Sequence, residues 1–320
     1  MDKNQPLTLD KKNPRVIAAQ ESEQQLYDYY GLQVKHHSIP LPHTGINIRV
    51  TDIGSGDPVV IVPGNTGDAF PLVPLMAKLK GRRIIAINRP GGGLSEGLDH
   101  RTVDFRELAV HTLNTVWDAF ALNNVPVIAH SIGGHWSLWM ALDQPQRVSS
   151  LTLLGVPGNL VSTSPPFALR LLSLPIINGL LFDLISPKSI QKALNGLAFM
   201  GHSKEGLAQL PDAMSECYFH FQKLPHYKIS SLSLMRHINR LTGSNPQITL
   251  TAQQLQQVQQ PTQFLWGTND PFASIVTGRQ IASLLPNAQF HAIEAGGHLP
   301  WLDKPAVCGN LISEFLNSLE

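Results

Sequence analysis

The stretch Val125–Leu138 reads Val-Pro-Val-Ile-Ala-His-Ser-Ile-Gly-Gly-His-Trp-Ser-Leu. A short β-branched apolar run ends at Ala129, and helical spacing of large apolar side chains begins after Gly134. The pattern predicts a strand, a sharp turn and a helix, with Ser131 at the apex. A serine in such a turn projects its hydroxyl clear of the sheet, and a small residue such as Gly133 relieves the crowding of the backbone.

The turn also has an electrostatic property. The backbone N–H of Ile132 stands at the start of the predicted helix, where unpaired donors and the helix dipole favour a developing negative charge. An ordinary strand-to-helix corner with a serine cap has the same residues, because Gly-x-Ser-x-Gly patterns are common and Ala129 here replaces the first glycine. The interpretation of Ser131 therefore depends on the rest of the chain.

Strand-like runs elsewhere, of which Val59–Val62 and Arg83–Asn88 lack polar alternation, predict the strands of a parallel sheet. These runs are Val59–Val62, Arg83–Asn88, Arg147–Leu154, Thr262–Trp266 and Gln289–Ile293. Helical patterns alternate with them, which favours right-handed crossovers and the α/β class, with a doubly wound, mostly parallel sheet. Before them, Leu32–Ile39 and Ile46–Ile53 alternate between polar and apolar residues and predict an antiparallel hairpin at a sheet edge.

The strand pattern stops after Gly155 and resumes after Gln260. We therefore expect three parts: an N-terminal tail and helix over 1–31, an α/β core over 32–155 and 261–320, and a helical cap over 156–260, inserted after the sixth strand. Proline-broken helical segments are expected in the cap at Pro166–Leu174, Lys188–Leu197, Pro211–Leu224 and Ser230–Leu241. The N-terminal helix is expected to pack on the outside of the core or against the cap.

The first part of the cap is rich in large apolar side chains. They are Phe167, Leu171, Leu172, Leu174, Ile176, Ile177, Leu180, Leu181 and Phe182. This composition suggests an apolar acyl or alcohol pocket, and packing of the helices on the core explains the same residues equally well.

Composition limits the classes of partner. The 320 residues carry a net charge of +1 and 15% charged residues, so no global field attracts nucleic acid or an anionic membrane. No cluster has metal-ligand spacing and no glycine pattern suits a dinucleotide, so we expect neither a metal nor a cofactor. The polar N-terminus and the interrupted apolar window Phe167–Ile185 predict a cytoplasmic protein without an integral membrane segment. Nothing in the sequence indicates the oligomeric state.

A serine hydroxyl is a poor nucleophile at neutral pH, so Ser131 needs an imidazole base and that base needs a carboxylate. Two later loops supply both groups. Asp270 lies in Gly-Thr-Asn-Asp-Pro after one predicted strand, and His298 lies in Glu-Ala-Gly-Gly-His after the next. Because ligands gather at the carboxyl ends of parallel strands, these loops are expected at the same edge as Ser131.

Five motifs in this order resemble those of the α/β-hydrolase superfamily, over nearly all of the chain after the N-terminal helix. The motifs are Pro63-Gly-Asn-Thr, Asn88-Arg-Pro-Gly-Gly-Gly-Leu-Ser, Ala129-His-Ser-Ile-Gly-Gly, Trp266-Gly-Thr-Asn-Asp270 and Gly296-Gly-His298-Leu-Pro-Trp. The resemblance implies that Ser131 is the nucleophile, His298 the general base and acid, and Asp270 the orienting carboxylate, in the chain order of that family.

The resemblance also implies an oxyanion hole made by the backbone N–H groups of Asn65 and Ile132. The chain departs from the family at three positions. Pro63 stands where histidine is usual, Ala129 where glycine is usual, and Asn88 where aspartate is common. Proline lacks the side-chain hydrogen bonds that often brace the oxyanion loop.

These residues predict a serine hydrolase that cleaves an ester-like bond of a small to medium hydrophobic substrate through an acyl-enzyme. The same triad serves hydrolysis of C–C bonds, lactones and thioesters and acyl transfer, and a hydrolase-like binding protein without turnover is a third alternative. Serine at the nucleophile position disfavours dehalogenases and epoxide hydrolases, which use aspartate there. Thr66, His130 and Trp301 are candidate pocket residues, although such histidines and tryptophans more often have structural roles.

Overall fold

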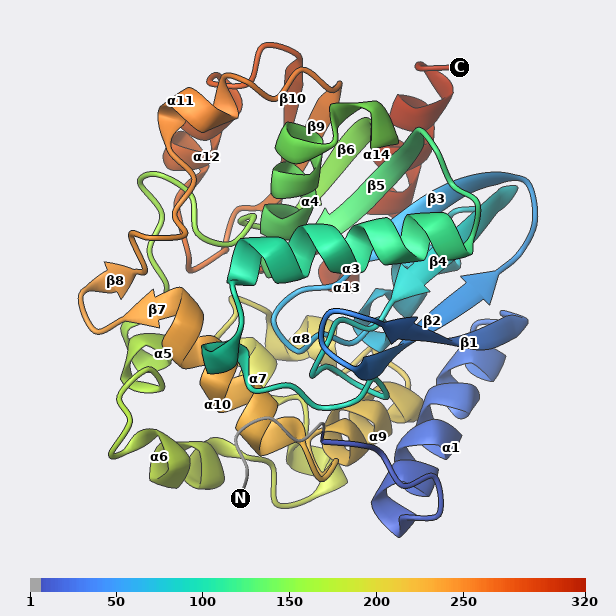
Figure 1. The fold of residues 1–320 in the computed structure, drawn as a ribbon, viewed down its shortest axis with the longest axis vertical. Helices are drawn as coiled ribbons and strands as arrows, with labels where there is room; N and C mark the ends of the chain where they lie inside the picture. Colours follow the sequence, from blue (N-terminus) through green and yellow to red (C-terminus); the bar gives the residue numbers. More distant parts are fainter. Residues whose placement is uncertain (1–6) are drawn as a thin grey trace.

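The structure is a computed structural model that describes residues 7–320, and its centre is an eight-stranded sheet flanked by helices (Figure 1). The strand order is β1-β2-β4-β3-β5-β6-β9-β10. The strands are β1 Val34–Leu41, β2 Ile46–Ile53, β3 Asp57–Val62, β4 Arg82–Ile87, β5 Val125–His130, β6 Val148–Leu154, β9 Thr262–Gly267 and β10 Ala288–Ile293. Strand β2 pairs antiparallel with β1 and β4, and the other neighbours pair in parallel. The predicted edge hairpin and mostly parallel sheet are confirmed.

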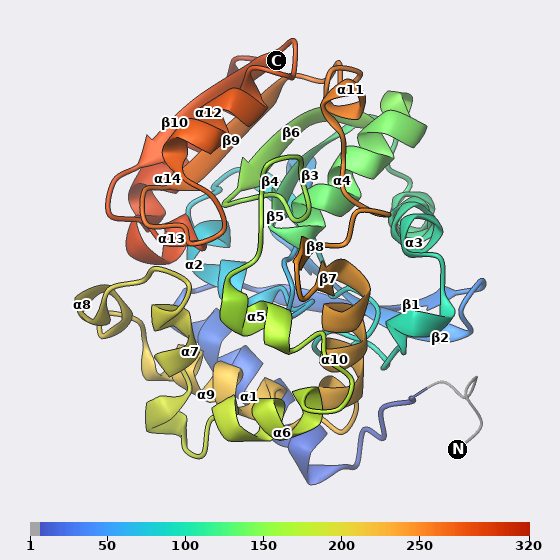
Figure 2. The same ribbon diagram turned by 90° about the vertical axis from the view of Figure 1, so that its left-hand side faces the viewer.

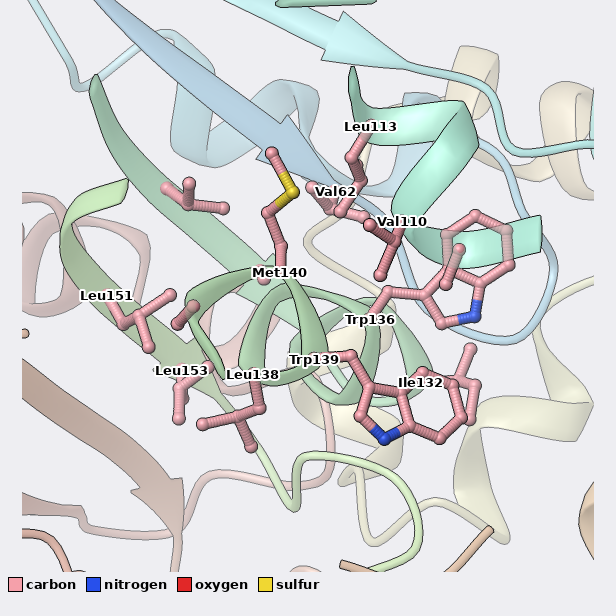
Figure 3. Packing of buried hydrophobic residues seen from close by; sticks show 14 of the residues in the cluster. Val62, Val110, Leu113, Ile132, Trp136, Leu138, Trp139, Met140, Leu151 and Leu153 are labelled. Atoms are coloured by element: carbon pink, nitrogen blue, oxygen red, sulfur yellow. The ribbon is translucent and has the colours of Figure 1, made fainter. Parts of the chain in front are cut away.

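Helices cover both faces of the sheet because the central strands are apolar on both faces. Val60 and Val62 of β3 pack in one buried cluster with α3 (Phe105–Ala119), α4 (Ile132–Asp143) and α12 (Ile275–Ala282). Figure 3 shows α4 side chains among residues of β3, α3 and β6. The alternate residues of β3 face a second cluster formed with α1 (Pro14–Tyr29), the 3₁₀ turn Phe70–Leu72, α2 (Val73–Met76), α13 (Pro300–Asp303) and α14 (Pro305–Asn317). This two-sided burial is what a doubly wound sheet requires.

A helical insertion lies between β6 and β9, so its predicted place after the sixth strand is confirmed, whereas its limits at residues 156 and 260 stay a prediction. It contains α5 Phe167–Leu171, α6 Asn178–Ile185, a 3₁₀ turn Ile190–Lys192, α7 Asn195–Ala198, α8 Lys204–Leu207, α9 Asp212–Phe221, α10 Tyr227–Ile238, β7 Asn239–Arg240, β8 Gly243–Ser244 and α11 Ala252–Leu255. Figure 2 shows α5 to α10 gathered at one end of the sheet.

The predicted helix over Lys188–Leu197 is wrong. The structure has only a 3₁₀ turn and the start of the four-residue helix α7 there, since Ser189, Asn195 and Gly196 have low helix propensity and do not sustain a longer helix. Helix α6 was not predicted, because its apolar residues merge with those of α5 into one window without a clear helical start.

The N-terminal helix α1 packs against α9 of the insertion, which confirms one of the two expected placements. Asn13 caps it by accepting a hydrogen bond from the N–H of Arg15. Its buried Glu23 carboxylate lies 2.6 Å from the guanidinium of Arg49 on β2. Helix α1 therefore connects strand β2 to the insertion.

Two further 3₁₀ turns, His100–Thr102 and Pro145–Arg147, complete the elements of the core. Among the described residues, no helix combines the length and apolarity needed to cross a bilayer.

Candidate active site

Ser131 occupies the junction between β5 and α4 with φ +51° and ψ −122°, a conformation that L residues rarely adopt. Its N–H donates to the carbonyl of Leu154 at 3.2 Å. A Cβ on Gly133 would lie 2.3 Å from the carbonyl oxygen of Val62, so this turn packs directly on β3 and requires glycine there. Ala129 is accepted in place of the usual glycine, and its methyl group is fully buried in the core. The strained turn holds the hydroxyl above the sheet.

The structure brings the three predicted polar side chains together. His298 Nε2 lies 2.9 Å from Ser131 Oγ, and His298 Nδ1 lies 2.8 Å from Asp270 Oδ2. With its proton on Nδ1, the imidazole donates to Asp270 and leaves the Nε2 lone pair free to accept the serine proton. Asp270 also accepts from the N–H of Val156 at 3.0 Å and from that of Phe272 at 3.0 Å, so its carboxylate has a fixed orientation.

Two rings enclose the His298 imidazole. Phe272 stacks on it with centroids 4.2 Å apart, and the His130 ring lies at 4.8 Å. His130 Nε2 donates to the His298 carbonyl at 3.2 Å. Burial, followed by the neighbouring His298, holds the pKa of His130 well below its ordinary value, so His130 is uncharged at neutral pH. His130 and Thr66, two of the candidate pocket residues, both line the cavity beside Ser131.

Trp301 does not line the cavity, which corrects the expectation that it contacts substrate. It is fully buried behind His130, with ring centroids 4.8 Å apart. Its indole N–H donates to the carbonyl of Pro71 at 2.6 Å. Because a buried indole N–H needs an acceptor, Trp301 takes a packing position that sequence alone does not distinguish from a pocket position.

Asn65 and Ile132, whose backbone N–H groups are the candidate oxyanion donors, line the same cavity as Ser131. Within residues 7–320, neither N–H has a hydrogen-bond acceptor. A Cβ on Gly64 would lie 3.2 Å from the Cβ of Ser131, so the loop after β3 runs directly alongside the serine. Two free donors beside a nucleophile can stabilise an oxyanion.

Arg89 braces this loop, a role that the sequence did not reveal. Its Nε–H donates to the carbonyl of Pro63 at 3.1 Å, and its Nη2 donates to the carbonyls of Gly64 at 2.5 Å and Asn65 at 3.2 Å. The guanidinium also lies 4.9 Å from the centre of the Trp136 ring. Burial lowers the pKa of Arg89 to about 9, but this value is still above neutral pH, so the guanidinium is charged. Arg89 thus supplies the side-chain hydrogen bonds that proline at position 63 cannot.

The cavity beside Ser131 has a volume of about 180 Å³ and a mostly apolar lining. Its apolar side chains include Leu72, Leu169, Leu197, Met200, Met235, Ile238 and Phe272. Among the described residues, no lysine or arginine lines it. Asp68 also lines it, and burial raises the pKa of that carboxyl well above its ordinary value, which favours the neutral form. The cavity therefore suits an uncharged, mostly apolar ligand.

The apolar residues that suggested a pocket in the first part of the insertion lie elsewhere. None of the nine lines the cavity, and Ile176 and Leu180 are 94% and 75% exposed. Leu169, Leu197 and Met235 form the wall instead.

In the described part of the chain, no group of three or more histidine, cysteine, aspartate or glutamate side chains is arranged to hold a metal ion. Cys217 and Cys308 are free and buried, and burial raises the pKa of both thiols. Neither lines the cavity.

Comparison with known proteins gives one family match. A family model described as alpha/beta hydrolase fold matches residues 57–305. A curated relative from Cupriavidus pinatubonensis, a 2-hydroxy-6-oxononadienedioate/2-hydroxy-6-oxononatrienedioate hydrolase, is 25% identical over 283 residues, which cover 86% of this chain and 92% of that protein.

Solved structures share the fold over nearly the whole chain. Naproxen esterase (carboxylesterase NP) from Bacillus subtilis superposes with a TM-score of 0.73 at 16% identity, covering 97% of this chain and 99% of that one. A meta-cleavage product hydrolase from Pseudomonas fluorescens IP01 superposes with a TM-score of 0.71 at 18% identity, covering 89% and 98%. At these identities the likeness establishes the fold and not the substrate.

Proposed function

Because this chain belongs to the alpha/beta hydrolase fold family, we propose that it is a serine hydrolase that cleaves an ester bond of a small, uncharged and mostly apolar substrate. One observation carries the proposal: the hydrogen-bonded chain from Ser131 through His298 to Asp270 stands at the wall of an apolar cavity. An imidazole within 2.9 Å of a serine hydroxyl can take the hydroxyl proton during nucleophilic attack. A serine that only caps a helix needs no such base.

In the proposed reaction, Ser131 Oγ attacks the ester carbonyl carbon while His298 Nε2 takes the hydroxyl proton. The C=O π electrons move onto the oxygen, and the N–H groups of Asn65 and Ile132 stabilise this oxyanion. Collapse of the tetrahedral intermediate breaks the C–O bond, and the leaving alcohol receives the proton from His298. A water then attacks the acyl-serine, with its proton passing to His298 and from there to the released Ser131. Each oxyanion donor contributes about 3 kcal/mol to transition-state stabilisation.

Cavity size and charge support the substrate class. A cavity of about 150 Å³ holds a benzene molecule, so the 180 Å³ available here suits one ring or a short acyl chain. No basic side chain other than histidine lines the cavity within the described residues, which leaves a substrate carboxylate without a charged partner.

A second candidate, C–C bond hydrolysis, is favoured by the curated relatives, which are named as hydrolases of 2-hydroxy-6-oxononadienedioate. A dioate has two carboxylates. Since the cavity presents no lysine or arginine among the residues described, its lining favours the neutral ester over such a dianion.

The experiment is a p-nitrophenyl ester series from acetate to decanoate, run with wild type, Ser131→Ala and the control Ser313→Ala. Ser313 lies on α14, where its hydroxyl donates to the carbonyl of Gly309. We expect the highest kcat/KM for short chains, a loss of at least about 10³-fold in Ser131→Ala, and wild-type rates in the control. Equal hydrolysis by wild type and Ser131→Ala would refute the proposal.

Two additional measurements distinguish C–C bond hydrolysis from a hydrolase-like binding protein without turnover. Turnover of 2-hydroxy-6-oxononadienedioate without ester hydrolysis would select C–C cleavage. Absence of both activities, together with no labelling of Ser131 by a fluorophosphonate, would select a binding protein without turnover.

A further inference from the structure

The backbone N–H groups of three successive residues, Gly297, His298 and Leu299, each donate a hydrogen bond. The first donates to Oδ2 of Asp303 at 2.9 Å, the second to the carbonyl of Met200 at 2.8 Å, and the third to Nε2 of His202 at 3.3 Å. Two of these three acceptors belong to the helical insertion, and the third belongs to α13. The insertion therefore contacts the backbone of the histidine loop directly.

His202 and Asp303 form a buried pair behind that loop. His202 Nδ1 lies 2.8 Å from Asp303 Oδ2, and their side chains are 0% and 6% exposed. Because Nε2 accepts from the N–H of Leu299, a neutral imidazole carries its proton on Nδ1, which lies at ion-pair distance from Asp303 without hydrogen-bond geometry. Both ring nitrogens thus lie close to a polar atom of residues 299–303, which directly follow the candidate base.

The segment around His202 fits closely between two loops of the site. Gly201 has φ +85°, and a Cβ there would lie 2.1 Å from the carbonyl oxygen of Asn269, which precedes Asp270. A Cβ on Gly297 would lie 2.7 Å from the Met200 carbonyl oxygen. Residues 200–202 therefore contact the loop of the candidate carboxylate and the loop of the candidate base at once.

We propose that His202 is a positioning residue that, together with Asp303, fixes the backbone on both sides of His298. The pair makes the insertion part of the machinery that activates Ser131. The inference rests on the proposed serine hydrolase function and deepens it. His202 does not line the cavity, so it acts on reactivity and not on binding of the substrate.

The test compares three variants. His202→Phe keeps the ring and removes both nitrogens, whereas His202→Gln restores one donor and one acceptor. His226→Phe is the matched control, because His226 is also a buried histidine of the insertion, only 2% exposed, and it packs against Gly97 rather than the histidine loop.

We expect His202→Phe to slow fluorophosphonate labelling of Ser131 and to lower kcat for esters by about 10- to 100-fold, since a 1 Å misplacement of reacting groups has effects of that size. KM should stay within about 2-fold of wild type, because the cavity wall is intact. His202→Gln should recover to within about 3-fold of wild type, and His226→Phe should match wild type in rate.

Equal labelling of His202→Phe and wild type, or an equal loss in His226→Phe, would overturn the inference. If wild type itself is not labelled, the proposed function fails, and amide hydrogen exchange over residues 296–302 then decides the inference alone. Faster exchange there in His202→Phe than in His226→Phe supports a clamp on the loop, and equal exchange in the two variants removes it.

Discussion

Replacing Ser131 by glycine should give a more stable protein than replacing it by alanine, although both changes remove the hydroxyl. The φ of +51° and ψ of −122° at this residue are open to glycine, whereas such a conformation destabilises an L residue by about 1–3 kcal/mol. Glycine also loses more backbone freedom on folding, about 0.5–1 kcal/mol relative to alanine. The free energy of unfolding of Ser131→Gly should therefore exceed that of Ser131→Ala by about 1 kcal/mol.

Thermal unfolding of the two variants measures this difference. The entropy of unfolding is about 2.1 cal/mol/K per residue, or roughly 0.7 kcal/mol/K for 320 residues, so 1 kcal/mol corresponds to about 1.5 °C in Tm.

Two control substitutions calibrate the effect. Ala121→Gly, at φ +52°, should also raise Tm, and Ala129→Gly, in the interior of β5, should lower it. If Ser131→Gly melts at or below Ser131→Ala while Ala121→Gly gains stability, the serine turn stores no strain and the reasoning is refuted.

Three further predictions concern the triad, pH and the cavity. Asp270→Asn should slow labelling of Ser131 by about 10³- to 10⁴-fold, because an amide favours the wrong imidazole tautomer, and labelling within 10-fold of wild type would contradict that role. Burial lowers the pKa of His135 to about 3, whereas the pKa of histidine in the unfolded chain is near 6.5. Below pH 6.5 the unfolded state therefore binds a proton that the folded state does not, and the free energy of unfolding falls. For this residue the loss is about 2 kcal/mol at pH 5. Urea unfolding of His135→Phe should therefore show a shallower loss, and an equally steep loss would count against a neutral buried imidazole. Met235→Ala should shift the preferred ester to longer acyl chains, whereas Met214→Ala, buried outside the cavity, should lower stability alone; the same chain-length preference in both variants would contradict the assigned wall.

The parts of the fold that follow from short-range patterns could be predicted from the sequence. Strands such as β3 and β4 contain apolar runs without alternation, and the serine turn is specified by neighbours within a few residues. The brace from Arg89 could not be predicted, because its three acceptor carbonyls lie 24 to 26 residues away along the chain and meet it only when two loops pack together. His202 lies 97 residues from the N–H of Leu299, so no local pattern connects them.

Composition was a poor guide to the insertion for a different reason. Ile176 and Leu180 are apolar, yet both are largely exposed. A run of apolar residues predicts burial only when the helix has a partner on that face, and spacing alone does not identify the partner. The cavity wall is assembled from residues such as Leu169 and Met235, which are far apart in the sequence and carry no shared pattern.

Residue 200 of the insertion both lines the cavity and holds the backbone of His298, so these two contributions cannot change independently. The Met200 side chain lines the cavity, and the Met200 carbonyl accepts the N–H of His298. Backbone movement of residues 200–202 to admit a larger substrate would therefore withdraw support from the candidate base. Met235, on α10, lines the same cavity, and among the residues described its sulfur accepts from the side-chain amides of Asn65 and Asn239 and not from the histidine loop. Since Met235 can change without moving His298, substrate size should be tunable through α10 at little loss of kcat, whereas changes at Met200 itself should alter KM and kcat together.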